Sequence, residues 1–422
     1  MTIDSGWVQI LKRECPLAFH GSLPCVPTTW FIDGQIKLMK AGWIDTWEGF
    51  FHRQFVDTIE RAIAFGASVV VMGFDDYTHV PPCKSMTQRK RSAKVVTYEY
   101  DPAEALPRKP PEDWNAAMRN RNFKINVIKF VLRNLEIHFK SCPKTVILDW
   151  VGAPVVLGRQ LALDGRELPV RDPGSKRGEC DIKAFGWTVW GPTVLQSTDG
   201  DFVPLALLQT PAAAAASSPI YLERLMTHLT PAKKRNVDGD RKRQLEYVCI
   251  STLLARVCEL LPSHASPAGT LATMIALTGC DFCNSMPAIG PAKLWAAKHA
   301  CRTLDFRTPN GVLAAVTSAY QLNFDKHVRP TRQGDIVGAS SEVATALGVY
   351  EQVSRNIRNN LATSQKHKDT IWTATHMHMH VLNVAWTVGE YWTRLGLYED
   401  PVCDERHGYK NNKKGNCEFI TD

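Results

Sequence analysis

The sequence predicts an α/β protein with a central, mostly parallel sheet and helices on both faces. Two short apolar runs near the start of the chain each end at an aspartate, and segments of helical period alternate with them. Strands that are apolar along their whole length are typical of parallel sheets, which are covered on both faces. Acids at the carboxyl ends of such strands are also where open α/β sheets build their sites.

The first apolar run covers residues 27–32 and ends at Asp33, and the second covers residues 67–74 and ends at Asp75. The segment between them, residues 36–65, has a helical period. Taken singly, each aspartate is better explained as a helix cap or a turn residue than as part of a site. Their functional meaning therefore depends on whether further acids follow in the same arrangement.

Several basic residues follow the second aspartate, namely Lys84, Arg89, Lys90 and Arg91. A solvated basic face explains any one of them equally well. Residues 98–112 are rich in proline and charge, which predicts a loop. After it, an apolar stripe predicts one long helix over residues 114–140, and a third apolar run predicts a strand over residues 145–151. Residues 156–176 have no clear period and are expected to be irregular.

Two pairs of acids come next. Glu179 and Asp181 stand at the start of a predicted helix that runs to about residue 190, and Asp199 and Asp201 follow a predicted strand that begins at residue 193. Alone, the first pair is typical of a helix N-terminus, which favours acids, and the second is typical of a turn. Two strand-end acids followed by Glu-x-Asp and Asp-x-Asp in this order form a pattern that chance explains poorly.

The part of the chain beyond the acid pairs contains an alanine- and serine-rich linker at residues 211–218 and two basic clusters within residues 233–243. The clusters are explained as a nucleic-acid contact, a nuclear localisation signal or a solvated loop. Residues 244–261 are predicted to be helical, and residues 301–422 are predicted to be mainly helical.

A helical hairpin is predicted between these segments. Residues 271–278 are apolar enough for a buried helix, and Pro291 stands in the first turn of the next helix, where proline is favoured. Gly290 would let the backbone approach a ligand, and the amides at such a helix start suit a phosphate. Asp281 lies just ahead of this turn, which indicates metal-dependent phosphodiester chemistry if the other acids converge on it.

This hairpin resembles the helix–two-turn–helix signature of the flap endonuclease superfamily, the structure-specific 5′ nucleases with a PIN-like fold. The matching residues are Gly279, Asp281, Phe282, Met286, Ile289, Gly290, Pro291 and Lys293. Ala288 stands where the family has the first glycine of Gly-Ile-Gly, and Thr2 stands where it has an N-terminal glycine. The amphipathic segment 6–12 is similar to the family's opening. The acid pattern also resembles that of the family, with all seven acids present over about residues 1–300.

The resemblance implies a 5′ nuclease domain over residues 1–300, with parts at 1–140 and 141–300. A helical arch would cover about residues 84–124, and the helix–two-turn–helix would cover about residues 270–300. Residues 301–422 would form a mainly helical C-terminal extension of unknown role.

The resemblance also implies two Mg²⁺ ions, for which Mn²⁺ can substitute, because hard cations prefer oxygen ligands. One ion would be surrounded by Asp33, Asp75, Glu179 and Asp181, and the other would lie nearer Asp181, Asp199, Asp201 and Asp281. The scissile phosphate would be contacted by Lys84 and either Arg91 or Arg89. Further nucleic-acid contacts would come from Lys90, Ser285, Gly290 and Lys293. A K⁺ ion would be bound by Ser285, Met286 and Ile289.

The implied activity is that of a 5′ flap endonuclease and 5′→3′ exonuclease on DNA in replication, repair or recombination. An RNA-cleaving 5′ nuclease uses the same acids and remains an alternative. A non-catalytic nucleic-acid-binding scaffold is a third, which the intact acids disfavour. No sliding-clamp peptide is present.

Bulk properties agree with a nucleic-acid partner without requiring one. The formal net charge of the 422 residues is +8, which permits a polyanion partner. No apolar run of 18 residues is present, so no membrane span is expected. The 12 cysteines are scattered, and the N-terminus has no secretory pattern, so we expect an intracellular protein, in the nucleus rather than the cytoplasm.

Overall fold

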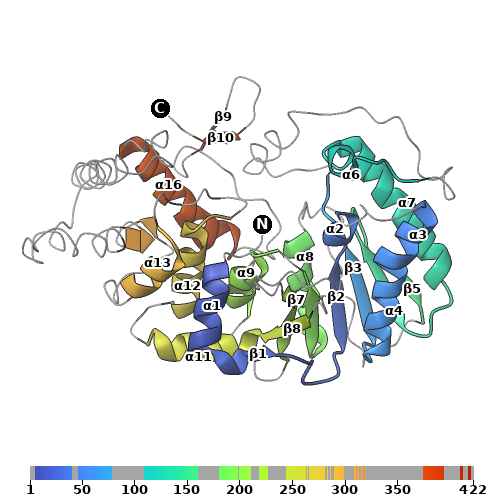
Figure 1. The fold of residues 1–422 in the computed structure, drawn as a ribbon, viewed down its shortest axis with the longest axis horizontal. Coiled ribbons are helices and arrows are strands. Elements are labelled where there is room, and N and C mark those ends of the chain that lie inside the picture. Colours follow the sequence, from blue (N-terminus) through green and yellow to red (C-terminus); the bar gives the residue numbers. More distant parts are fainter. Residues whose placement is uncertain are drawn as a thin grey trace, which may run out of the picture.

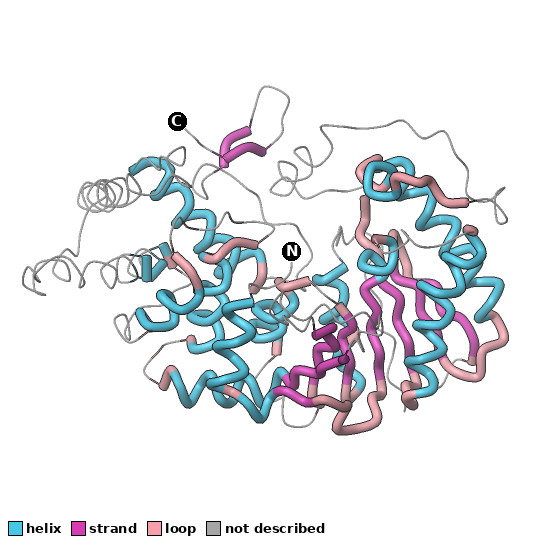
Figure 2. The backbone as a smooth tube through the Cα atoms, viewed as in Figure 1, coloured by secondary structure: helices cyan, strands magenta, loops and turns pink. Residues whose placement is uncertain are grey.

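A computed structural model of the chain has an α/β architecture built on one mixed, eight-stranded sheet. Helices lie on both sides of this sheet (Figures 1 and 2). A small two-stranded sheet lies near the C-terminus. The structure describes residues 5–39, 46–77, 109–159, 180–197, 199–210, 218–226, 244–262, 264, 266–280, 283, 286, 289–298, several positions between 308 and 319, 374–393, 409–411 and 417–419.

The predicted mostly parallel sheet is confirmed, with antiparallel strands added at its edges. The strand order is β1-β8-β7-β6-β2-β3-β4-β5, and the five strands from β7 to β4 in this order run parallel. The strands β8, β1 and β5 pair antiparallel to their neighbours. The strands are β1 (Phe19–His20), β2 (Thr29–Asp33), β3 (Val69–Gly73), β4 (Thr145–Asp149), β5 (Val155–Gly158), β6 (Thr193–Gln196), β7 (Ile220–Met226), β8 (Gln244–Cys249), β9 (Tyr409–Asn411) and β10 (Cys417–Phe419).

The helices are divided between the two faces of the sheet. They are α1 (Ser5–Glu14), α2 (Gly34–Leu38), α3 (Trp47–Phe51), α4 (Asp57–Ala64), α6 (Trp114–Ala117), α7 (Arg121–Phe139), α8 (Cys180–Gly186), α9 (Phe202–Gln209), α11 (Ile250–Leu260), α12 (Pro267–Leu277), α13 (Pro291–Ala297) and α16 (Ala374–Trp386). Short 3-10 or π turns are formed by Pro16–Ala18, His52–Val56, Thr188–Trp190 and Thr387–Tyr391.

Two hydrophobic cores follow from the alternation of side chains along the strands, because successive residues of a strand point to opposite faces. In β2, Phe31 enters the core that contains α1, α8, α9, α11 and α12, whereas Trp30 and Ile32 enter the core that contains α3, α4 and α7. Figure 1 shows α1, α11 and α12 to the left of β2 and β3, and α3, α4 and α7 to the right of these two strands. Both cores are fully buried at the central strands, which explains why these strands are apolar along their length.

The predicted single helix over residues 114–140 is wrong, because the chain forms α6 and α7 with a break at Met118–Asn120. Asn120 caps the second helix: its Oδ1 accepts a hydrogen bond from the backbone N–H of Phe123 at 3.1 Å. Trp114 in α6 is buried, and its Nε1 donates to the carbonyl oxygen of Leu38 at 2.7 Å. This part of the expected arch therefore packs against the core, while residues 78–108 lie outside the described residues.

Two further expectations are corrected at the edges of the sheet. Residues 156–158, the start of the stretch expected to be irregular, belong to β5 (Val155–Gly158). Residues 244–249, expected to begin a helix, form β8, and only Ile250–Leu260 is helical. The strand β7, which pairs with β8, was not predicted. Both β5 and β8 pair antiparallel to their neighbours, so their place depends on a partner strand rather than on their own pattern.

The helical hairpin is formed by α12 and α13. Gly279 ends α12 with φ +106°, a left-handed conformation that favours glycine at a helix end. Pro291 is the first residue of α13, as predicted. Within the C-terminal extension, α16 packs in the same core as α12. Across the described part of the chain, no helix is long and apolar enough to span a lipid bilayer.

Candidate functional site

The candidate site lies at the carboxyl ends of the central parallel strands. Asp33 is the last residue of β2, and Asp75 follows the end of β3 by two residues. Asp33 caps α2, since its Oδ1 accepts from the backbone N–H of Gln35 at 3.0 Å, and it is 5 % exposed. Gly34 is needed beside it, because a Cβ there would lie 2.7 Å from the carbonyl oxygen of Gly73. The two strand ends are therefore packed backbone against backbone.

The charges of three other predicted acids act on Asp33. Its pKa is raised from 3.8 to about 7, first by burial and next by the negative charge of Asp75. Asp199 and Asp181 raise this pKa further, whereas the hydrogen bond from Ser197 lowers it. Acids from three separate stretches of the sequence therefore act electrostatically on the one at the end of β2.

The start of α8 faces Asp75. The backbone N–H of Cys180, the first residue of α8, donates to Asp75 Oδ1 at 2.9 Å, and the hydroxyl of Tyr77 donates to Asp75 Oδ2 at 3.2 Å. Burial and the charges of Asp33 and Asp75 raise the pKa of the Cys180 thiol well above its usual value. Asp181 follows directly in the first turn of α8, next to the residue whose N–H binds Asp75.

Ser197 links Asp33 to the acids that follow β6. Its hydroxyl donates to Asp33 Oδ2 at 2.9 Å and accepts from the backbone N–H of Asp199 at 3.1 Å. Asp199 Oδ1 in turn accepts from the backbone N–H of Asp201 at 3.1 Å. Asp201 is 5 % exposed and immediately precedes α9. The Asp-Gly-Asp turn is thus hydrogen-bonded to the end of β2.

A buried lysine lies beside the acids. Lys183 of α8 is 2 % exposed, and its Nζ donates to the carbonyl oxygen of Phe74 at 3.0 Å and to that of Trp150. Asp149, the last residue of β4, has its Oδ1 3.9 Å from this Nζ. Trp187 Nε1 donates to Asp149 Oδ2 at 2.7 Å. These contacts tie α8 to the ends of β3 and β4.

The remaining predicted residues of the catalytic and basic groups lie outside the described residues. They are Lys84, Arg89, Lys90, Arg91, Glu179, Asp281 and Ser285.

The described part of the hairpin leaves space in front of Gly290. This residue has an extended conformation with φ −119°, and a Cβ added to it would meet nothing within 4 Å. Met286 and Ile289 are buried, so both residues belong to the core beneath the hairpin. The carbonyl oxygen of Met286 accepts from the N–H of Ile289 at 3.5 Å. Burial lowers the pKa of Lys293 in α13.

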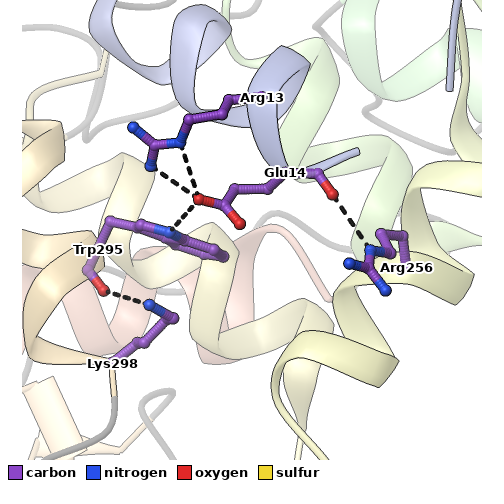
Figure 3. A network of polar contacts seen from close by, with 5 residues as sticks. All are labelled: Arg13, Glu14, Arg256, Trp295 and Lys298. Carbon is purple, nitrogen blue, oxygen red and sulfur yellow. Dashed lines mark hydrogen bonds and ion pairs between the residues drawn. The ribbon is translucent and has the colours of Figure 1, made fainter. Parts of the chain in front are cut away.

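Helix α1 is bonded to both helices of the hairpin and to α11. Trp7 Nε1 donates to the hydroxyl of Thr278 at the end of α12, at 3.0 Å. Glu14 accepts from Trp295 Nε1 of α13 at 3.3 Å through its carboxylate, and from Arg256 Nε of α11 at 3.1 Å through its carbonyl oxygen (Figure 3). The N-terminal helix thereby fixes the hairpin against the sheet.

The described acids fit a hard divalent cation in chemistry and charge. They supply carboxylate oxygens, and the pKa of Asp33 is raised first by burial and next by the neighbouring negative charges, a repulsion that a bound cation would relieve. Among the residues that the structure describes, no group of three or more His, Cys, Asp or Glu side chains is arranged to hold a metal ion. Both carboxylate oxygens of Asp33 and of Asp75 accept hydrogen bonds, although each oxygen keeps a second lone pair. Because the described side chains form no group of three ligands, coordination requires either that these carboxylates turn or that Glu179 and Asp281 contribute.

Sequence reasoning missed Ser197, Asp149 and Lys183. Asp149 had the same signal as Asp33, because it ends an apolar strand, and that signal was sufficient to find it. Ser197 follows β6 directly, but a serine after a strand has no distinctive pattern. Lys183 lies on a helix, where a lysine ordinarily indicates the solvated face, so its burial depends on tertiary packing.

Comparison with known protein families and curated sequences found no match for this chain.

Proposed function

We propose that the protein is a divalent-metal-dependent phosphodiesterase that cleaves nucleic acid as a 5′ nuclease, with branched or 5′-flap DNA as the substrate. The observation that carries the proposal is the convergence of Asp75, Asp181 and Asp199 on the buried Asp33, whose pKa they raise. Clustered carboxylates at the carboxyl edge of a parallel sheet are a donor set for Mg²⁺ or Mn²⁺. The resemblance of the hairpin and of the acid order to the flap endonuclease superfamily gives the substrate class.

In this proposal the carboxylates of the chain hold the metal ions and orient them toward the phosphodiester. Asp33, Asp75, Asp181 and Glu179 would hold one cation. Asp199, Asp201 and Asp281 would hold a second one, also near Asp181. When bound, two such cations activate the attacking water and stabilise the leaving oxygen of the phosphodiester.

Basic residues and the hairpin complete the proposed role. Lys84 and Arg91 or Arg89 supply positive charge to the scissile phosphate, which stabilises charge that develops in the transition state. The hairpin binds the duplex at the backbone amides near Gly290, assisted by Lys293 and, at its carbonyls, by a K⁺ ion. Space in front of Gly290 agrees with a phosphate at this position.

The test is Mg²⁺-dependent cleavage of three end-labelled substrates: a 5′-flap DNA, a blunt DNA duplex and a single-stranded RNA. Wild type is compared with two variants, Asp75→Asn and Asp76→Asn. The second is the matched control, because it removes the same charge from the adjacent residue, which is not one of the seven predicted acids. We expect flap cleavage by wild type and Asp76→Asn, and a loss of at least about a hundredfold in Asp75→Asn, because a ligand carboxylate is removed.

The outcomes separate the alternatives. Cleavage of RNA with intact flap DNA would move the protein to the RNA-cleaving 5′ nucleases. Absence of metal-dependent cleavage of every substrate would refute the enzymatic proposal and favour a nucleic-acid-binding scaffold. Equal losses in Asp75→Asn and Asp76→Asn would show that Asp75 has no special place in the site.

A further inference from the structure

The contacts of Lys183 extend beyond filling space in the core. Its side chain is among the largest fully buried ones, although a methionine of similar length would fill the same volume without removing an ammonium group from water. Its Nζ instead reaches carbonyl oxygens on two different segments, those of Phe74 and Trp150, and lies 3.9 Å from Asp149 Oδ1. The three acceptors come from the ends of β3 and β4, and the donor comes from α8.

These contacts surround Asp75 on its backbone side. Phe74, whose carbonyl oxygen accepts from Lys183, directly precedes Asp75, and Trp150 Nε1 donates to the carbonyl oxygen of Asp75 at 3.0 Å. On the other side, Asp75 Oδ1 accepts from the first N–H of α8, that of Cys180. Asp75 is therefore held between the start of α8 and the segments that Lys183 ties to α8.

The contacts of Lys183 join the two elements that carry Asp75 and Asp181. Asp75 follows a strand, whereas Asp181 lies in the first turn of α8, two residues before Lys183. A change in the position of α8 along the edge of the sheet would alter the spacing of the two carboxylates. A cation that both carboxylates share is sensitive to such a shift, because partners that orient the ligands set its affinity.

We propose that Lys183 is a positioning residue of the metal site, whose ammonium group fixes α8 against the ends of β3 and β4 and thereby sets the spacing between Asp75 and Asp181. This inference rests on the proposed function, since it assumes that the two acids share a cation. Asp149 supports this arrangement, because its carboxylate faces the ammonium group of Lys183 and is oriented by the hydrogen bond from Trp187.

The experiment measures Mn²⁺ affinity by isothermal titration calorimetry, without substrate, together with unfolding by urea. The variants are Lys183→Met, and Lys183→Met combined with Asp149→Asn, which removes both buried charges and keeps an acceptor for the Trp187 N–H. The matched control is Lys12→Met on α1, which removes an ion pair of 2.6 Å to the buried Glu246 away from the acids.

We expect both Lys183 variants to bind Mn²⁺ about 10- to 100-fold more weakly than wild type, the range typical for loss of a group that orients metal ligands. The control should stay within about twofold of wild type, because its ion pair does not orient a metal ligand. The double variant should regain stability relative to Lys183→Met, because no unpaired buried charge is left, yet it should not regain affinity. If Lys183→Met does not fold, the Mn²⁺ affinity of the double variant alone tests the inference.

Two results would overturn the inference. Affinity that recovers together with stability in the double variant would show a merely structural role for the ion pair. Affinity unchanged in both Lys183 variants would show that the spacing of the acids does not depend on Lys183. Absence of Mn²⁺ binding by the wild type would instead overturn the proposed function, and this inference with it.

Discussion

Asp33→Asn should make the protein more stable at alkaline pH in the absence of divalent cations. The substitution removes one negative charge from a 5 % exposed position beside Asp75 and Asp199. Asparagine can keep the helix cap, because its one carbonyl oxygen can still accept from the Gln35 N–H, and its amide NH2 then replaces Oδ2 and donates to Ser197 Oγ. The change in stability should therefore report the cost of ionising Asp33, which comes first from its burial and next from the charges of the other acids.

The magnitude follows from the pKa of Asp33 in the folded state, which is about 7 compared with an ordinary value of 3.8. Between these values the native state binds a proton that the unfolded state has released, so stability falls as pH rises from about 4 to about 7. At about 1.4 kcal/mol per pKa unit, the full cost reaches about 4 kcal/mol above pH 7. At pH 5 it amounts to about 2 kcal/mol, because the window is only partly crossed.

The assay is urea unfolding of wild type and Asp33→Asn in EDTA at a series of pH values from 5 to 8. We expect the stability advantage of the variant to grow by about 2 to 3 kcal/mol over this range. A surface control, Asp57→Asn on the exposed face of α4, should give a difference that does not change in this way. Saturating Mg²⁺ at pH 8 should reduce the advantage, because a cation that binds only the folded wild type stabilises it.

Two results would refute this reasoning about the acid cluster. A difference between Asp33→Asn and wild type that is constant from pH 5 to 8 would mean that Asp33 does not titrate near neutral pH. A variant less stable than wild type at pH 8 in EDTA would mean that the charged form of Asp33 is stabilised by its surroundings.

Three further predictions concern the packing around the site. Gly34→Ala should destabilise the fold by about 1 to 3 kcal/mol in urea unfolding, because its Cβ would lie 2.7 Å from the Gly73 carbonyl oxygen. Gly290→Ala should leave stability within about 0.5 kcal/mol of wild type, because its Cβ meets nothing within 4 Å, but should raise the KM for flap DNA; an unchanged KM would argue against a phosphate there. Trp7→Phe should cost about 1 kcal/mol, because the 3.0 Å hydrogen bond to Thr278 is lost, and unchanged unfolding would show that this bond adds nothing.

The central strands could be predicted because they are buried on both faces. In β2 and β3 every residue is buried, so each appears in the sequence as an uninterrupted apolar run. The residue that ends such a run then lies at the edge of the sheet, which is why Asp33 and Asp75 were found. The convergence of the acids thus followed from local pattern and from the parallel arrangement.

The edge strands and the helix break could not be predicted in the same way. In β8, Tyr247, Val248 and Cys249 are all apolar, so the strand has no clear alternation after Glu246, and it runs directly into α11, which let a helical period extend through it. Pairing with β7, which is distant in the sequence, decides the conformation. The break before α7 did have a local signal, because asparagine at position 120 is a favoured N-cap.

The register of the sheet helps to explain why two strand-end aspartates with similar sequence patterns, Asp33 and Asp149, acquire different roles. Gly73 at the end of β3 is paired with Asp33 on one side and with Asp149 on the other, so the two aspartates lie level on the same face of the sheet. They are two strands apart, which corresponds to about 10 Å. Nothing in the strands themselves distinguishes them.

Helix α8 makes the difference, because it crosses the sheet above these positions with different residues facing each strand. Its first residue, Cys180, lies over Gly73, where a Cβ would be 2.9 Å from its Sγ, and its N–H binds Asp75. One turn later Lys183 reaches the β4 side, where it lies 3.9 Å from Asp149 Oδ1. Asp149 thus has a cation supplied by the chain, whereas Asp33 faces further carboxylates that raise its pKa. The same helix that places a lysine beside one strand-end acid adds Asp181 to the others, and this asymmetry gathers carboxylates on the β2 and β3 side, where we propose that the metal binds.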